Sequence, residues 1–343
     1  MKGKKILPII ISFLLLTPLV YGFGPTTHGY INTNAIPELP DSSIKQTIVN
    51  NRAYYDACFV AVDTTVLYYY TSASTYEATH SWSFCDALMK TAETDQQKAC
   101  AYGCVAHLIQ DSVSHNLFVP KQIRSLYIPN FPLHPLAEAR FEAHIIKDYP
   151  IEYTKIQRVL KPLLQDEVML DKFQQAVSTQ TVLDVREHLK LFNSVLGDPG
   201  GFYSQYYFIG GFWKGMAYGD STTGIIFLVL AGVTFALGYR FNRRLLKYIP
   251  TILFTLIGVF LMVGGISGLT TSSDFNYYMQ IAIDRSQQVF TPQGWSTRYR
   301  FDPTGFTALN EASQSIMWVW VLIGIIFVGL IVWYVWRRFF KKK

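Results

Sequence analysis

Three long apolar segments near the carboxyl end of the chain constrain its fold most strongly. They cover about residues 224–239, 249–269 and 316–336 of the 343 residues. The last two are long enough to cross the hydrocarbon core of a bilayer as helices, and the first is marginal. No amphipathic period interrupts them, which disfavours ordinary core helices. The sequence therefore predicts a membrane anchor with three transmembrane helices over residues 223–343.

Basic residues flank these segments on one side only. Four Lys and Arg lie within 240–248, between the first two segments, and five follow the third segment. Because basic loops stay in the cytoplasm, this loop and the basic tail are predicted to lie inside. Residues 23–222 and an outer loop, 270–315, then lie outside. We expect a multi-pass cell-membrane protein with a cytoplasmic C-terminus.

The amino-terminal residues support the same orientation. Three lysines precede a short apolar run over residues 6–20. Small or neutral residues, Val20 and Gly22, lie at the end of this run and just beyond it. This pattern is typical of a secretory signal peptide, predicted here as residues 1–22. An uncleaved anchor is the alternative. Either reading places residues 23–222 outside the cytoplasm.

The formal net charge of +6 follows this topology. The signal peptide carries +3 and the two inner stretches carry +4 and +5, whereas residues 23–222 carry −5 and the outer loop −1. An acidic outer domain does not attract a polyanion, so no specific nucleic-acid partner is expected. Membrane lipids are the expected partners of the apolar segments.

All four cysteines, Cys58, Cys85, Cys100 and Cys104, lie in the predicted outer domain. An even number of cysteines in an oxidising compartment predicts two disulfides. Three pairings remain open. Cys100 with Cys104 is the least attractive, because residues one helical turn apart rarely have disulfide geometry. Zinc ligation by these thiols is disfavoured, since the spacing lacks a second CxxC-type knuckle.

The outer domain is predicted to be all-α. A long apolar-rich segment over 42–70 has a cap among Asp41, Ser42 and Ser43, and Thr94 or Asp95 caps a second helix. Two further helices are expected over 135–149 and 184–197. Signals for strands and hairpin turns are scarce. Residues 200–220, rich in Gly and aromatics, are interpreted as an interfacial belt or linker before the first span.

His107, Asp111 and His115 recur at intervals of four residues. On a helix each such step turns the face by about 40°, so the three side chains share one stripe. Imidazole and carboxylate on one stripe form half of a metal site, although a polar helix face is the alternative. Further candidate ligands are spread along the outer domain: His28, Asp63, His80, His134 and Glu138.

In this order the candidates resemble the ligand pattern of the zinc-dependent phospholipase C family, which is related to single-strand-specific zinc nucleases. These enzymes are all-α and hold three zinc ions in a cleft. The resemblance covers about residues 23–145. It departs at two points: three residues separate Asp111 from His115, where the secreted enzymes have five, and the aromatic N-terminus would be Phe23 instead of tryptophan.

The resemblance implies a ligand set for three Zn²⁺ ions. The first ion would take Asp63, His80, His107 and Asp111. The second would take His115, His134 and Glu138. The third would take His28, Asp111 as a bridge, and the amine and carbonyl of Phe23.

The activity implied is hydrolysis of a phosphodiester by zinc-activated water, with Asp63 able to accept a proton from that water. A phospholipid cleaved on the glycerol side of phosphate is the first expectation for the substrate. A zinc-dependent nuclease or nucleotide phosphodiesterase is the second. A non-catalytic, zinc-stabilised surface binding module is the third.

Overall fold

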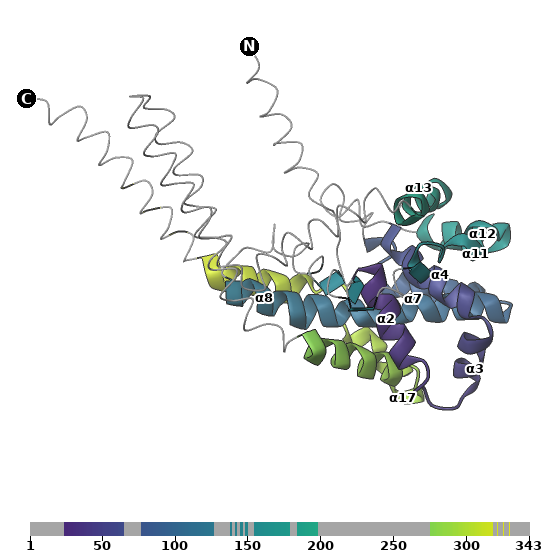
Figure 1. The fold of residues 1–343 in the computed structure, drawn as a ribbon, viewed down its shortest axis with the longest axis horizontal. Coiled ribbons are helices and arrows are strands. Elements are labelled where there is room, and N and C mark those ends of the chain that lie inside the picture. Colours follow the sequence, from purple (N-terminus) through teal and green to yellow (C-terminus); the bar gives the residue numbers. More distant parts are fainter. Residues whose placement is uncertain are drawn as a thin grey trace, which may run out of the picture.

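The computed structural model describes most of the predicted outer domain and outer loop. It covers residues 24–64, 77–126, 138, 141–142, 145–146, 148–149, 154–178, 184–197, 275–317, 321, 325 and 329. All regular secondary structure within these residues is helical (Figure 1). The predicted all-α class is therefore confirmed for this part of the chain.

A central helix, α7, organises the first half of the described chain (Figure 1). It spans Asp95–Val113. The described helices that precede it are α2 (Pro25–Ala35), α3 (Ser43–Asn50), α4 (Arg52–Ala61) and α6 (Trp82–Thr91). Helices α4 and α6 pack along α7. Because residues 103–113 of α7 are all buried, the polar side chains in this stretch are enclosed in the core.

Two of the predicted caps are confirmed. The Ser42 hydroxyl accepts a hydrogen bond from the Lys45 amide, and Thr94 forms a capping box with Gln97. The long segment predicted to start here is divided, because Asn51 leaves the helical conformation, with φ −122° and ψ 35°. It therefore forms α3 and α4 as separate helices.

Helix α7 continues through a π-helical turn, η3 (Ser114–Phe118), into α8 (Val119–Leu126). A π turn holds more residues than an α turn, so it changes the direction in which the following side chains point. His115 lies in this turn.

Three helices cover the side of α4 and α6: α11 (Lys161–Leu164), α12 (Glu167–Ser178) and α13 (Val185–Gly197). Helix α12 packs against α6 and α13, with the Phe173 ring edge-on to Phe84 at 4.9 Å between centroids. Helix α13 ends at Gly197, where the sequence predicts it to end. Of the helix expected over 135–149, the described residues 138, 141–142, 145–146 and 148 are helical.

The described part of the predicted outer loop is helical and belongs to the core. It comprises helical residues 275–289, α17 (Pro292–Thr297), the 3-10 turn η4 (Arg298–Arg300) and helical residues 306–317. Phe275, Ala282 and Leu309 share a buried cluster with Ile31 of α2 and Val113 of α7. A segment that sequence patterns place beside the membrane spans therefore packs onto the helices of the first half.

Two disulfides join α7 to its neighbours. Cys58 of α4 bonds Cys100, and Cys85 of α6 bonds Cys104. The prediction of two disulfides is confirmed, and Cys100 and Cys104 are not paired with each other. Both bonds hold helices that flank α7 against it.

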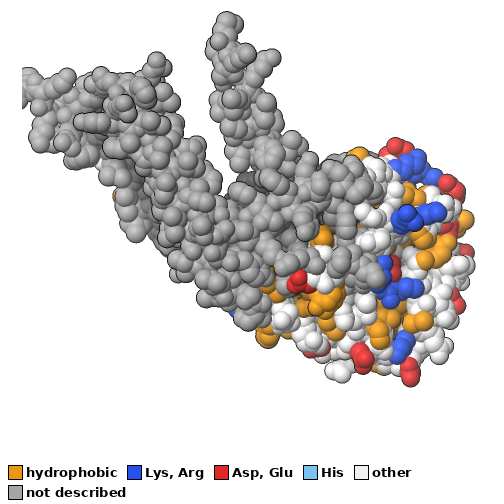
Figure 2. Space-filling view, viewed as in Figure 1, with side chains coloured by type: hydrophobic (Ala, Val, Ile, Leu, Met, Phe, Trp, Pro, Cys, Tyr) orange, Lys and Arg blue, Asp and Glu red, His pale blue; other side chains and the backbone are white. Residues whose placement is uncertain are grey.

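Within the described residues, no helix is both long and apolar enough to cross a bilayer. The predicted signal peptide, the linker 200–220 and the spans 224–239 and 249–269 lie outside those residues, as does most of 316–336. On the visible face of the described part, Lys and Arg side chains are interspersed with Asp and Glu (Figure 2).

Candidate metal centre

Helix α7 brings His107 and Asp111 to one buried face. The Nε2 atom of His107 lies 3.0 Å from Oδ2 of Asp111, and neither side chain is exposed. The i, i+4 spacing therefore places imidazole and carboxylate side by side, as the stripe predicts.

Helix α2 adds His28, which faces the other oxygen of Asp111. The Nε2 atom of His28 lies 3.2 Å from Oδ1 of Asp111. The His28 ring also lies over His107, with 4.4 Å between centroids. The two oxygens of Asp111 therefore face different histidines, which is the arrangement expected of a bridging carboxylate.

Asp63 and His80 complete this cluster from two helix ends. Asp63 follows α4 and His80 precedes α6. The Oδ1 atom of Asp63 lies 3.5 Å from Nε2 of both His80 and His107, and His80 Nε2 lies 3.7 Å from Asp111 Oδ2. Ligand atoms within 4.8 Å of one another define two overlapping groups that could hold a metal ion: His28, His107 and Asp111; and Asp63, His80 and His107.

His115, which lies in the π turn, forms a further buried pair with Glu138. The Nε2 atom of His115 lies 3.3 Å from Oε1 of Glu138, and both side chains are fully buried. The same Glu138 oxygen accepts a hydrogen bond from the Ser114 hydroxyl at 3.1 Å. These are two of the three residues implied for the second ion. His134, the third, and Phe23 lie outside the described residues.

The outer hydrogen bonds of His28 determine which of its nitrogens carries the proton. The Ser286 hydroxyl donates its proton to the Ala282 carbonyl. Its oxygen can therefore only accept a hydrogen bond from Gln110, whose Nε2 atom donates to it at 3.1 Å. The Gln110 amide is thereby oriented with Oε1 toward His28, and it accepts from Nδ1 of that ring at 2.8 Å. In the neutral ring, the Nε2 atom of His28 therefore presents its lone pair to the centre.

The same reasoning holds for two other histidines. Thr79 donates its hydroxyl to the Val62 carbonyl at 2.7 Å, so its oxygen accepts from Nδ1 of His80 at 3.2 Å. The Pro303 carbonyl accepts from Nδ1 of His115 at 2.6 Å. All three rings therefore turn Nε2 inward in the tautomer that binds metals.

These supporting residues are absent from the set of candidates found in the sequence. Gln110 is adjacent to Asp111, and a buried polar residue beside the stripe was its only signal. Ser286 and Pro303 are more than 170 residues away from the histidines that they orient. No local pattern in the sequence links them to the site.

Buried polar atoms in the centre lack ordinary hydrogen bonds. Within the described part of the chain, Oδ1 of Asp63, Nε2 of His107 and both oxygens of Asp111 are buried and have no hydrogen-bond partner. Such groups are costly to bury unless something compensates them. Convergent nitrogen and carboxylate lone pairs fit a divalent metal, which would supply that compensation.

Burial and mutual charge set the protonation of the cluster. Burial raises the pKa of Asp63 to about 7 and lowers the pKa of His107. Burial alone would raise the pKa of Asp111, but the His107 and His28 side chains hold it well below its usual range. A neutral imidazole beside an ionised carboxylate is the state in which both bind a metal.

Comparison of the chain with protein-family models, with curated proteins and with solved structures finds no significant match. The chemistry of the centre is therefore inferred from its own residues.

Proposed function

We propose that the chain is a zinc-dependent phosphodiesterase that hydrolyses phospholipids in the manner of a phospholipase C. The observation that carries this proposal is the placement of Asp111, whose two oxygens face His28 on one side and His107 on the other. A carboxylate between two sets of imidazoles suits a cluster of metal ions. Clustered metal ions hydrolyse phosphoesters by holding both the attacking and the leaving oxygen.

The donor set favours a catalytic site over a structural one. Closed structural zinc sites prefer thiolates, whereas catalytic sites use His and carboxylate ligands with an open position. All four cysteines are in disulfides and offer no thiolate. The first ion would be held by Asp63, His80, His107 and Asp111, the second by His115 and Glu138, and the third by His28 and Asp111.

When bound, zinc lowers the pKa of a water toward neutrality and neutralises phosphate oxygens. The chain's own residues orient the groups around that water. Asp63 is 5 % exposed, whereas His107 and Asp111 are fully buried, so Asp63 lies nearest the edge of the cluster. We assign to Asp63 the role of accepting the proton that the attacking water loses.

The phospholipid substrate rests on the predicted membrane anchor. Three spans would hold the centre near lipid headgroups and raise their effective concentration. The packing of residues 275–317 against α2 and α7 requires both regions to lie on one side of any membrane that the chain crosses. The proposed topology, with 23–222 and 270–315 both outside, meets this requirement.

The function is tested with the full chain purified in a non-ionic detergent. We expect zinc-dependent cleavage of short-chain phospholipids that exceeds cleavage of single-stranded DNA and of bis-p-nitrophenyl phosphate. A chelator should abolish the activity and added zinc restore it. Asp111→Asn should remove activity, whereas Asp95→Asn, an exposed aspartate of the same helix, should not.

Three outcomes would contradict the proposal. Preference for single-stranded DNA would indicate the nuclease alternative. Stoichiometric zinc without turnover of any phosphodiester would indicate a zinc-stabilised binding module. Activity that survives complete metal removal would exclude the metal centre from the reaction.

A reporter fused after Lys343 tests the proposed topology. A reporter that is active only in the cytoplasm should work there, because the basic tail is predicted inside. A reporter active only outside the cytoplasm should be silent at the same position, and the reverse pattern would exclude this orientation.

A further inference from the structure

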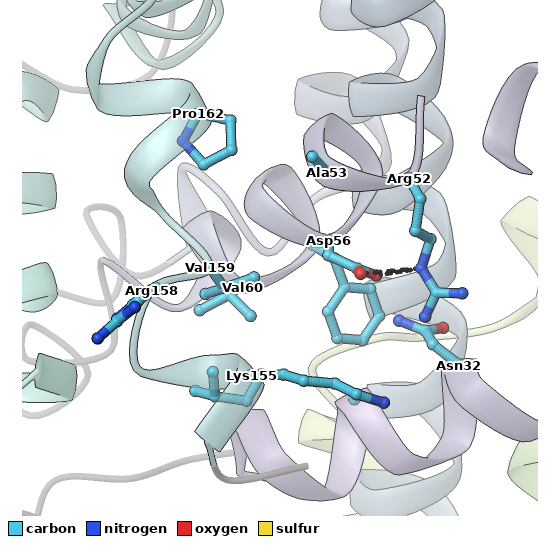
Figure 3. Close-up of a pocket in the computed structure, with 12 residues that line it drawn as sticks. Asn32, Arg52, Ala53, Asp56, Val60, Lys155, Arg158, Val159 and Pro162 are labelled. Carbon is cyan, nitrogen blue, oxygen red and sulfur yellow. Dashed lines mark hydrogen bonds and ion pairs between the residues drawn. The ribbon is translucent and has the colours of Figure 1, made fainter. Parts of the chain in front are cut away.

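A cavity that contains none of the candidate metal ligands lies between α2, α4 and the segment around α11 (Figure 3). Its volume is about 190 Å³, and it is lined by residues of α2, α4 and the turn before α11. Phe59 lines the cavity, and its ring packs against His28 and His107 at 5.0 and 5.3 Å between centroids. The aromatic ring therefore stands between this cavity and the metal ligands.

Asn32 presents an unsatisfied donor to this cavity. Its Oδ1 atom accepts from the Tyr55 hydroxyl at 3.1 Å and from Nε2 of Gln110 at 2.9 Å, which determines the orientation of the amide. Its Nδ2 atom is buried without a hydrogen-bond partner, and the residue is only 1 % exposed. Figure 3 shows this nitrogen directed into the cavity. A buried donor left unpaired is destabilising, and a bound acceptor would compensate it.

Positive charge gathers around the same amide. Arg52 donates from Nε to both oxygens of Asp56 at 2.8 Å, and its terminal nitrogens extend toward Asn32 (Figure 3). The Lys155 amino group reaches the same end of the cavity, whereas Arg158 points away (Figure 3). Two cations, Arg52 and Lys155, therefore face this end of the cavity against the single carboxylate of Asp56, so the potential there is positive.

We propose that this cavity binds a phosphate group, either as inorganic phosphate or as a small phosphate monoester. The planar guanidinium of Arg52 suits two oxygens of such an anion, and Lys155 supplies a point charge. The Asn32 amide would donate to a further oxygen. The two cations at this end of the cavity complement an anion, and the volume accommodates a group of this size. The proposal does not depend on catalysis at the metal centre.

The test uses the full chain in a non-ionic detergent after removal of metal with a chelator, because phosphate also binds zinc. Calorimetric titration with inorganic phosphate should show one binding site. Asn32→Asp keeps the accepting oxygen and replaces the donor with a second, negatively charged oxygen, so it should weaken binding at least tenfold. Lys155→Gln should also weaken it. Arg158→Gln, the matched control in the same segment, should leave the affinity unchanged.

A second arm of the titration distinguishes the sources of the phosphate group. Tighter binding of phosphocholine than of inorganic phosphate would support the site and identify a phosphorylated headgroup as its ligand. Tighter binding of inorganic phosphate would support the site with the free anion as its ligand. Circular dichroism of each variant checks that the helical fold is retained.

Two results would overturn the proposal. The first is phosphate binding that appears only after zinc is restored, which would place the anion at the metal centre and leave the proposed function intact. The second is affinity that neither Asn32→Asp nor Lys155→Gln changes. Absence of phosphate binding to the metal-free chain at millimolar phosphate would also overturn the proposal.

Discussion

Replacing Glu142 by Gln should detach the first turn of the helix that carries His28. The Glu142 side chain is 1 % exposed, and its carboxylate accepts three hydrogen bonds of 2.8 Å. The Thr26 amide donates to Oε1, and the Thr27 amide and hydroxyl donate to Oε2. Gly24, at the N-cap of α2, has no side chain with which to cap this helix. Glu142 therefore supplies the cap from a distant part of the chain.

The magnitude follows from what Gln cannot do. It keeps one accepting oxygen, and its amide group turns a donor toward a backbone N–H that then has no acceptor. Loss of one hydrogen bond to a charged group costs about 1.5–3 kcal/mol. Loss of a negative charge at a helix N-terminus costs about 0.3–1 kcal/mol more. We expect Glu142→Gln to lower the free energy of unfolding by about 2–4 kcal/mol.

The measurement is urea unfolding of the metal-free full chain, followed by near-ultraviolet circular dichroism. Glu187→Gln is the control, because this carboxylate pairs with Lys190 at the exposed surface and its loss should not change the midpoint. Hydrogen exchange of the α2 amides should accelerate in Glu142→Gln. A free energy of unfolding within 0.5 kcal/mol of the parent would refute the reasoning.

Three further predictions concern the metal centre and its supports. Asp111→Asn should lower the zinc content measured by mass spectrometry with little loss of helix, and an unchanged metal count would exclude a bridging role. Removal of the Cys58–Cys100 disulfide by a double alanine substitution should lower stability by about 4 kcal/mol for its separation of 42 residues, and an unfolding midpoint equal to the parent's would contradict this. Gly305→Ala should lower the melting temperature and the zinc content together, because the φ of Gly305 is +58° and the added Cβ would collide with His115. A melting temperature equal to the parent's would contradict this.

Much of the candidate site could be predicted from the sequence because its ligands lie at regular helical spacing. His107 and Asp111 sit on one face of α7 for the same reason that any i, i+4 pair does. The cap at Thr94 and the end of α13 at Gly197 also follow from local rules. His28, Asp63 and His80 have no such spacing, and their membership came from a resemblance in order along the chain. The structure places His28 and His80 beside Asp111, and Asp63 beside His107.

The spacing rule did not extend to His115. Three residues separate it from Asp111, so a regular helix would place it on the same stripe. In the structure His115 lies in the π turn Ser114–Phe118 and its Nε2 pairs with Glu138, as the resemblance implies, while its charge still lowers the pKa of Asp111. A change of helix type depends on how the neighbouring segments pack, and no propensity in this stretch indicates it.

The sequence by itself determined the helical class, two disulfides without their pairing, and the residue types that form the metal centre. Each of these depends on composition, on local spacing or on the even number of cysteines. Only the tertiary structure decided which nitrogen of each histidine faces inward, because the partners that orient the rings lie on other segments. Ser286 acts on His28 through Gln110, and Pro303 acts on His115, across more than 170 residues. Contacts between side chains so distant along the chain arise from packing, and packing has no local signature.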